Sequence, residues 1–262
     1  MTSLRVKTDL RHELKYLIRH DVQAQLLDEL GEYLQVDAHA QADGTYPITS
    51  LYYDTPDHKF YWDKIEGHRV RRKVRVRTYD DAADDAAMTP DTVCFLEIKQ
   101  RVDKLIRKRR AALPYAQAIA FDDFDTPPAD LPAEAREVMQ EVYYLQRTLD
   151  IRPTCIVRYH RLALEGNALY PDLRVTFDSN LRSRVHDLSL LSTDHADNSF
   201  FLPPEFMILE VKVNSNVPYW LAQMLNRHRC RLQRFSKYGA AVEHHHLAGP
   251  RRRVLVAPTT MR

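Results

Sequence analysis

Residues 69–79 read RVRRKVRVRTY, and this stretch decides the fold that we expect. Side chains alternate between the two faces of a β-strand, so every second residue shares a face. One face here is entirely basic and carries Arg69, Arg71, Lys73, Arg75 and Arg77. The opposite face carries Val70, Val74 and Val76, together with Arg72. Same-face neighbours lie about 7 Å apart, where two like charges repel by about 2.4 kcal/mol at an effective dielectric of 20. The stretch therefore predicts a bound anion, and phosphate fits because the guanidinium fork of Arg matches its oxygens.

The same division into a charged and an apolar face recurs along the chain. Three glutamates each stand two residues before a lysine, so each pair shares one face of its strand. Arg158 shares a face with His160, and Arg174 shares one with Thr176 and Asp178. The three Glu–Lys pairs are Glu13 with Lys15, Glu97 with Lys99, and Glu210 with Lys212.

A charged strand face has an alternative interpretation, since it is most often the wet side of a half-exposed sheet. For any single strand here that interpretation is favoured. Solvated faces normally mix Thr, Ser, Lys and Glu, however, and five consecutive basic positions do not follow from solvation alone. Taken together, the strands predict charged faces that point into a tunnel and apolar faces that helices and other segments cover.

About eight strands and three helices are expected, the helices near residues 21–34, 133–150 and 218–230. Most connections are too short for parallel crossovers, so the strands should pair antiparallel. The predicted fold class is α+β, a closed eight-stranded antiparallel β-barrel with flanking helices. We expect an N-terminal tail at residues 1–10, the tunnel domain at 11–243 and a basic C-terminal tail at 244–262.

Composition narrows the function classes. The 262 residues carry a formal net charge of only +2, which argues against a protein that coats nucleic acid. The three cysteines form no CxxC pair, so zinc and disulfide frameworks are poorly supported. No run of about 18 apolar residues is present and the N-terminus lacks an apolar signal core, so we expect a cytoplasmic protein without a membrane segment.

An ordered series of motifs resembles the VTC domain, the catalytic domain of the vacuolar transporter chaperone complex, within the triphosphate tunnel metalloenzyme or CYTH-like superfamily. The motifs are RHELKY (11–16), LYYDT (51–55), RVRTY (75–79), CFLEIKQR (94–101), IVRYHRLAL (156–164), LRVTFD (173–178), MILEVKVN (207–214) and RFSKYG (234–239). The resemblance implies an eight-stranded tunnel in which the terminal phosphoryl group of a nucleoside triphosphate, such as ATP, is transferred to inorganic polyphosphate.

The resemblance also implies roles for individual residues. The expected grip on the triphosphate comes from Arg75, Arg77, Arg158 and Arg174. The expected guides for the acceptor phosphate are Lys15, Lys99, Arg234 and Lys237. Arg71 and Lys73 extend the basic strand, and Lys108 is the choice within 107–110, where the register is ambiguous. Replacing Arg75 with Ala is expected to weaken triphosphate binding and to relieve repulsion in the empty protein.

Carboxylates in such a tunnel can hold Mn²⁺ or Mg²⁺, which prefer carboxylate and phosphate oxygens. Glu210 is the strongest candidate, since it stands in the most apolar strand and matches the family's metal-binding glutamate. Glu13 and Glu97 fit ion pairing with neighbouring cations as well as metal binding. Two other functions remain open, a triphosphatase that transfers to water and a non-catalytic module that binds polyphosphate.

Overall fold

The computed structural model describes residues 12–37, 44–79, 88–103, 105–120, 126–196, 198–214 and 216–249. The tail expected at residues 1–10 and Arg11 of the first motif lie outside the described residues. The long strands are β1 (His12–Arg19), β3 (Thr45–Asp54), β4 (Val70–Tyr79), β5 (Val93–Val102), β6 (Leu105–Pro114), β7 (Arg152–Gly166), β8 (Arg174–Arg184) and β9 (Phe206–Val213), and the short ones are β2 (Leu34–Val36) and β10 (Arg231–Leu232). The helices are α1 (His20–Leu30), α2 (Lys59–Ile65), α3 (Tyr115–Ile119), α4 (Ala133–Leu149), α5 (Tyr219–Arg227) and α6 (Lys237–His244).

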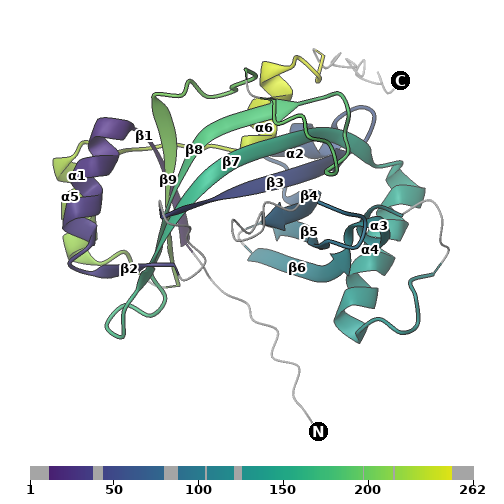
Figure 1. Ribbon diagram of the computed structural model, residues 1–262, viewed down its shortest axis with the longest axis horizontal. Helices are drawn as coiled ribbons and strands as arrows, with labels where there is room; N and C mark the ends of the chain where they lie inside the picture. Colours follow the sequence, from purple (N-terminus) through teal and green to yellow (C-terminus); the bar gives the residue numbers. More distant parts are fainter. Residues whose placement is uncertain are drawn as a thin grey trace, which may run out of the picture.

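The strands form one antiparallel sheet in the order β10-β1-β9-β8-β7-β3-β4-β5-β6, with β2 paired to β7. The α+β class is confirmed. Closure of the barrel is not, because the hydrogen-bonded path through the described strands ends at β6 on one side and at β10 on the other. The sheet curls instead, so that β1 and β9 at one end face β4, β5 and β6 at the other (Figure 1).

Helices α3 and α4 cover the outer face of β4, β5 and β6 (Figure 1). Val74 and Val76 are fully buried in a core that also contains Leu96, Val138 and Val142. This is the apolar face that the alternation in residues 69–79 predicts. Burying a side chain of this size contributes about 1.5–3 kcal/mol, so packing against α4 holds the basic face of β4 turned inward.

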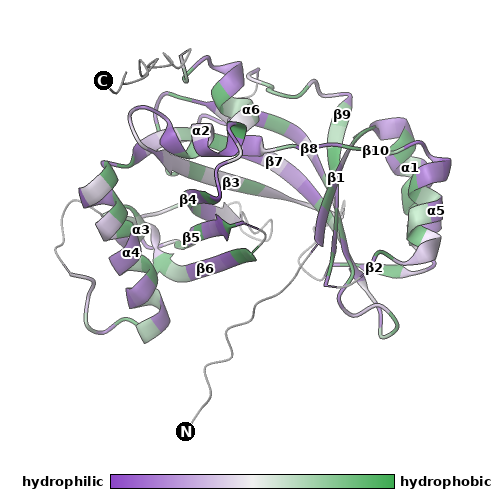
Figure 2. Cartoon of the chain, turned by 180° about the vertical axis from the view of Figure 1, so that it is seen from behind, coloured by the Kyte–Doolittle hydropathy of each residue, from purple (hydrophilic) through white to green (hydrophobic). Residues whose placement is uncertain are grey.

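Helices α1 and α5 cover the outer face of β1, β8 and β9 in the same way (Figure 2). Leu26 of α1 and Leu221 of α5 share a core with Leu209 and Val211 of β9. The neighbouring residues of β9, Glu210 among them, therefore face the opposite, concave side of the sheet.

Helix α6 packs on the concave face, a placement that the sequence did not predict. Tyr238 and Val242 share a core with Tyr52, Val157 and other residues of the inner face. Packing continues beyond the boundary expected at residue 243, since Leu247 and Ala248 also contact this core. No helix among the described residues has the length and apolar character needed to cross a membrane.

Candidate functional site

A cavity of about 850 Å³ lies on the concave face, and all eight long strands and the start of α6 contribute side chains to it. Of the twenty described residues that line it, eleven are Lys or Arg and three are Glu. The basic lining residues are Lys15, Lys73, Arg75, Arg77, Lys99, Lys108, Arg110, Arg161, Arg174, Lys212 and Lys237, and the acidic ones are Glu13, Glu97 and Glu210. The structure thus gathers, in one hollow, most of the charged residues singled out in the sequence.

Arg75 and Arg77 of β4 are held in different ways. Arg75 Nε donates to Glu97 Oε2 at 2.6 Å and its Nη1 donates to the Tyr52 hydroxyl at 3.0 Å. Arg77 is buried and donates to two hydroxyls, Ser50 Oγ at 3.1 Å and Tyr159 at 3.3 Å. Arg77 makes no direct ion pair with a carboxylate in the described part of the chain, although Glu97 acts on its charge from nearby; it is therefore well placed to bind an anionic oxygen.

Lys73, on the same face of β4, also lacks a carboxylate partner among the described residues. Its Nζ donates to Ser236 Oγ at 2.8 Å, at the N-cap of α6. Burial lowers its pKa well below the ordinary value for lysine, and the neighbouring cations Lys15 and Lys99 lower the pKa further. An anion beside Lys73 would remove that electrostatic penalty.

Glu97 is a buried carboxylate that two cations hold. Its Oε2 accepts from Arg75, and its Oε1 lies 3.1 Å from Lys108 Nζ. Burial alone would raise its pKa, but Arg75, Arg77 and Lys108 outweigh burial and lower it. In β6 the side chains of Lys108 and Arg110 line the cavity, whereas Arg107 and Arg109 do not. Arg110 lies opposite Glu97 in the strand register, and Lys108 makes the ion-pair contact with it.

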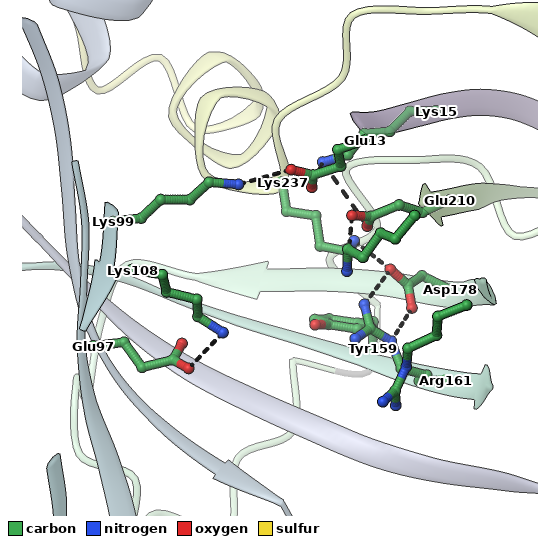
Figure 3. Close-up of polar contacts among 12 residues, drawn as sticks. Glu13, Lys15, Glu97, Lys99, Lys108, Tyr159, Arg161, Asp178, Glu210 and Lys237 are labelled. Carbon is green, nitrogen blue, oxygen red and sulfur yellow. Dashed lines mark hydrogen bonds and ion pairs between the residues drawn. The ribbon is translucent and has the colours of Figure 1, made fainter. Parts of the chain in front are cut away.

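Glu13 and Glu210 form a pair of adjacent carboxylates on β1 and β9. In the strand register Glu13 lies opposite Lys212, and Lys15 lies opposite Glu210, so the two carboxylates are diagonal neighbours. Lys15 Nζ lies 3.1 Å from Glu13 Oε1 and 3.9 Å from Glu210 Oε2 (Figure 3). These carboxylates raise the pKa of Lys15 to about 12 despite its burial.

Glu210 fits the chemistry of a metal ligand. Its Oε1 is buried without a hydrogen bond, and Lys212 Nζ lies 2.9 Å from it in ion-pair contact. Lys212 and Lys15 outweigh the effect of burial and hold the pKa of Glu210 well below its usual range. The described residues contain no cluster of three or more His, Cys, Asp or Glu side chains arranged around a metal. Two carboxylates are nonetheless sufficient for Mg²⁺, which commonly takes its remaining ligands from water and substrate phosphates.

Sequence reasoning missed a second charged cluster, built around Asp178. This carboxylate is fully buried and accepts from Arg161 Nε at 2.7 Å and from Lys237 Nζ at 2.5 Å (Figure 3). Lys237 Nζ also lies 4.5 Å from the centre of the Tyr159 ring. Asp178 was seen in the sequence to share a face with Arg174, but its role in anchoring Lys237 depends on contact across 59 residues.

Three of the expected site residues do not line the cavity. Arg158 is on the outer face of β7, where it donates to Thr49 Oγ1 at 3.3 Å, and Tyr159 and Arg161 take the inner positions. Arg158 and His160 share one face of β7 as expected, but the cavity lining comes from the opposite face. Buried apolar residues occur on both faces, such as Val157 and Ile156, so hydropathy does not decide which face is the inner one. Arg71 and Arg234 lie near each other outside the cavity lining, and repulsion from Arg101 and Arg234 adds to burial in lowering the pKa of Arg71.

Arg174 lines the cavity at the end where β8 begins. It donates to Asp37 Oδ2 at 2.6 Å and to Glu165 Oε1 at 2.8 Å, so its charge is already shared between two carboxylates. Lys99 reaches across the cavity to Glu13 Oε2 at 2.8 Å, which joins β5 to β1 although these strands do not pair.

Comparison with known proteins matches one family model and 31 chains of solved structures, two of which are distant in sequence from this chain. The model of the VTC domain matches residues 10–246. A Bacillus halodurans structure, described as that of a candidate adenylate cyclase, shares 12% identity at a TM-score of 0.47 and covers 86% of this chain and 92% of its own. The PH1819 protein from Pyrococcus horikoshii OT3 shares 11% identity at a TM-score of 0.45, covering 89% of this chain and 98% of its own. No curated protein sequence matches the chain.

Proposed function

Because this chain belongs to the VTC domain family, we propose that it is a metal-dependent polyphosphate polymerase. It would transfer the terminal phosphoryl group of a nucleoside triphosphate, with ATP the expected donor, to a growing chain of inorganic polyphosphate. The observation that carries this proposal is the charge of the cavity, whose described lining has eleven basic side chains and three acidic ones. A single triphosphate with one divalent cation neutralises only part of that excess, whereas a longer polyanion neutralises more of it.

The donor triphosphate would lie against the arginines of the inner face. Arg77 offers guanidinium nitrogens that donate to the hydroxyls of Ser50 and Tyr159, and Arg75 lies on the same face of β4. Arg161 of β7, which is separated from β4 by β3, takes the place expected for Arg158, and Arg174 of β8 lies at the end of the cavity. Charge stabilisation and positioning of this kind supply most of the catalysis in phosphoryl transfer.

The acceptor chain would lie along the lysines that converge from three elements. Lys15 of β1, Lys99 of β5 and Lys237 of α6 line the same hollow. An oxygen of the acceptor's terminal phosphate would attack the γ-phosphorus, and the bond from that phosphorus to the β,γ-bridging oxygen would break and release the nucleoside diphosphate. This acceptor oxygen is already anionic, so the reaction requires no general base.

Glu210, with Glu13 beside it, would hold a divalent cation. The ion would supply positive charge at the transferring phosphoryl group. The donor set of carboxylate oxygens suits both Mg²⁺ and Mn²⁺.

The experiment that tests the proposal is incubation of the protein with ATP and Mn²⁺, followed by gel electrophoresis and ³¹P NMR of the products. We expect a ladder of polyphosphate chains together with ADP. Release of only ADP and orthophosphate would instead identify a triphosphatase. Tight binding of polyphosphate without turnover would identify a binding module.

A further inference from the structure

Asp54 is a buried carboxylate outside the cavity lining, at the end of β3. It is 1% exposed. Its Oδ1 accepts from the backbone N–H groups of Thr55 and Phe60, both at 2.8 Å, and its Oδ2 accepts from that of Tyr61 at 3.0 Å. These three bonds tie the carboxylate to the start of α2.

A further donor reaches Asp54 from a distant part of the chain. The Tyr238 hydroxyl, 184 residues away, donates to Asp54 Oδ2 at 2.5 Å. Tyr238 is itself buried and stacks on Tyr52 with ring centroids 5.1 Å apart. The carboxylate therefore joins the first turn of α2 to the first turn of α6.

The first turn of α6 is also the part of that helix that enters the cavity. Lys237, directly before Tyr238, contacts Asp178 and the Tyr159 ring, and Ser236 holds Lys73. A helix that is seated correctly at Tyr238 thus places two side chains of the site at once.

Capping of α2 does not account for the whole arrangement. The three backbone donors already satisfy the carboxylate at the helix start, and α2 would keep its cap without Tyr238. We propose that Asp54 and Tyr238 are positioning residues that seat α6, so that Lys237 and Ser236 reach the acceptor end of the cavity. The expected effect on polyphosphate affinity rests on the proposed function, whereas the role of Tyr238 in holding α6 in place does not.

Tyr238→Phe is the variant that tests this inference, because it removes one hydroxyl and keeps the ring that stacks on Tyr52. We expect hydrogen–deuterium exchange at residues 237–244 to become at least about tenfold faster. Affinity for long-chain polyphosphate should fall about tenfold, while the KM for ATP should change less than about twofold. General destabilisation of the protein would change the KM for ATP as well, so it would not produce a loss of affinity confined to polyphosphate.

Tyr61→Phe is the matched control. The Tyr61 hydroxyl also joins α2 to α6, but it donates to Glu243 Oε1 at 3.3 Å, close to the C-terminal end of α6. This variant should leave polyphosphate affinity within about twofold of the wild type. Asp54→Asn turns one acceptor oxygen into an amide group that would face at least one backbone N–H at the start of α2, so it should loosen α2 as well as release Tyr238. If Tyr238→Phe does not fold, Asp54→Asn replaces it as the test, with faster exchange at residues 237–244 as the expected result.

A double variant shows whether Tyr238 acts through its neighbour. In the Lys237→Ala background, Tyr238→Phe should produce little further loss of polyphosphate affinity. An equal loss in both backgrounds, or unchanged exchange at residues 237–244, would overturn the inference. A wild-type protein that does not bind polyphosphate would overturn the proposed function, and the exchange measurement would still decide whether Tyr238 seats α6.

Discussion

Lys73 and Arg75 are neighbours on one face of β4, yet their surroundings differ. Arg75 is paired with the buried carboxylate of Glu97, so Arg75→Ala would deprive that carboxylate of its nearest cation. Breaking a buried pair in this way is destabilising. The sequence predicts that removing Arg75 relieves repulsion in the empty protein. In the structure this effect is expected for Lys73 instead, because its Nζ donates to a hydroxyl and has several cations nearby.

Lys73→Met should accordingly stabilise the empty protein at pH 7 by roughly 1 kcal/mol, the size of a typical single-substitution effect. Because the pKa of Lys73 is lowered by folding, the unfolded chain binds more protons there between this lowered pKa and about 10.5. Stability of the wild type should thus rise with pH across that window, and the variant should lose this part of the rise. Urea unfolding at several pH values measures both effects, with Lys73→Arg as the charged control. A variant less stable than the wild type at pH 7 would contradict the argument.

Glu210→Gln should abolish turnover while the protein remains folded. The substitution keeps the shape of the side chain but removes the charge that would hold a divalent cation, and it leaves Lys212 without its carboxylate contact. We expect the free energy of unfolding to fall by about 1–3 kcal/mol. Turnover and Mn²⁺ titration should be compared with Glu141→Gln, since Glu141 pairs with Arg109 on the outside of the sheet. Full turnover of Glu210→Gln with Mn²⁺ would refute the metal assignment.

At the scale of elements, the strands differ in how clearly hydropathy distinguishes the inward face from the outward face. On β4 the outer valines are buried against α4 and the inner basic residues line the cavity. On β7 both faces carry apolar residues, for example Val157 on the inner face and Ile156 on the outer one. Hydropathy thus orients β4 unambiguously and leaves β7 undecided.

Arg77→Ala and Arg158→Ala should therefore behave differently, although the sequence assigned both residues to the triphosphate. Arg77→Ala should weaken long-chain polyphosphate binding at least about tenfold and reduce the slope of log affinity against log salt by about 0.7 to 0.9. Arg158→Ala should bind within about twofold of the wild type, because its side chain is on the outer face of β7. Binding titrations at several salt concentrations compare the two. Equal losses would mean that Arg158 reaches the polyanion.

At the scale of the whole molecule, the open sheet encloses its cavity by side-chain contacts as well as by strand pairing. Lys99 and Glu13 join β5 to β1 at 2.8 Å across the unpaired edges. Helix α6 rests on the concave face and adds Lys237. The result is a polar hollow with an excess of positive charge in a chain whose formal net charge is only +2.

This concentration of charge predicts how affinity depends on anion length and salt. Long-chain polyphosphate should bind at least about tenfold more tightly than tripolyphosphate at low salt. Its affinity should fall at least about 100-fold between about 50 and 200 mM salt, because several phosphate contacts release counterions. Tripolyphosphate, with fewer contacts, should show a shallower dependence. Isothermal titration calorimetry measures both slopes, and parallel slopes would contradict a site that extends beyond three phosphates.

The sequence by itself determined the strands and their two-sided character. The register of residues 69–79, and the pairing of Glu97 with Lys99 or Glu210 with Lys212 on one face, follow from the backbone of a single strand, where every second side chain shares a face. Helices near 133–150 and 218–230 were likewise predictable, since their apolar spacing is local.

Only the tertiary structure decided which charges meet and where the sheet ends. Asp178 anchors Lys237 across 59 residues, and Asp54 meets Tyr238 across 184. The outer position of Arg158 and the open edge between β6 and β10 in the described chain depend in the same way on distant segments. Alternation specifies which residues share a face, but the side that becomes the interior is set by the helices that cover the other one, and those contacts form only when the chain is folded.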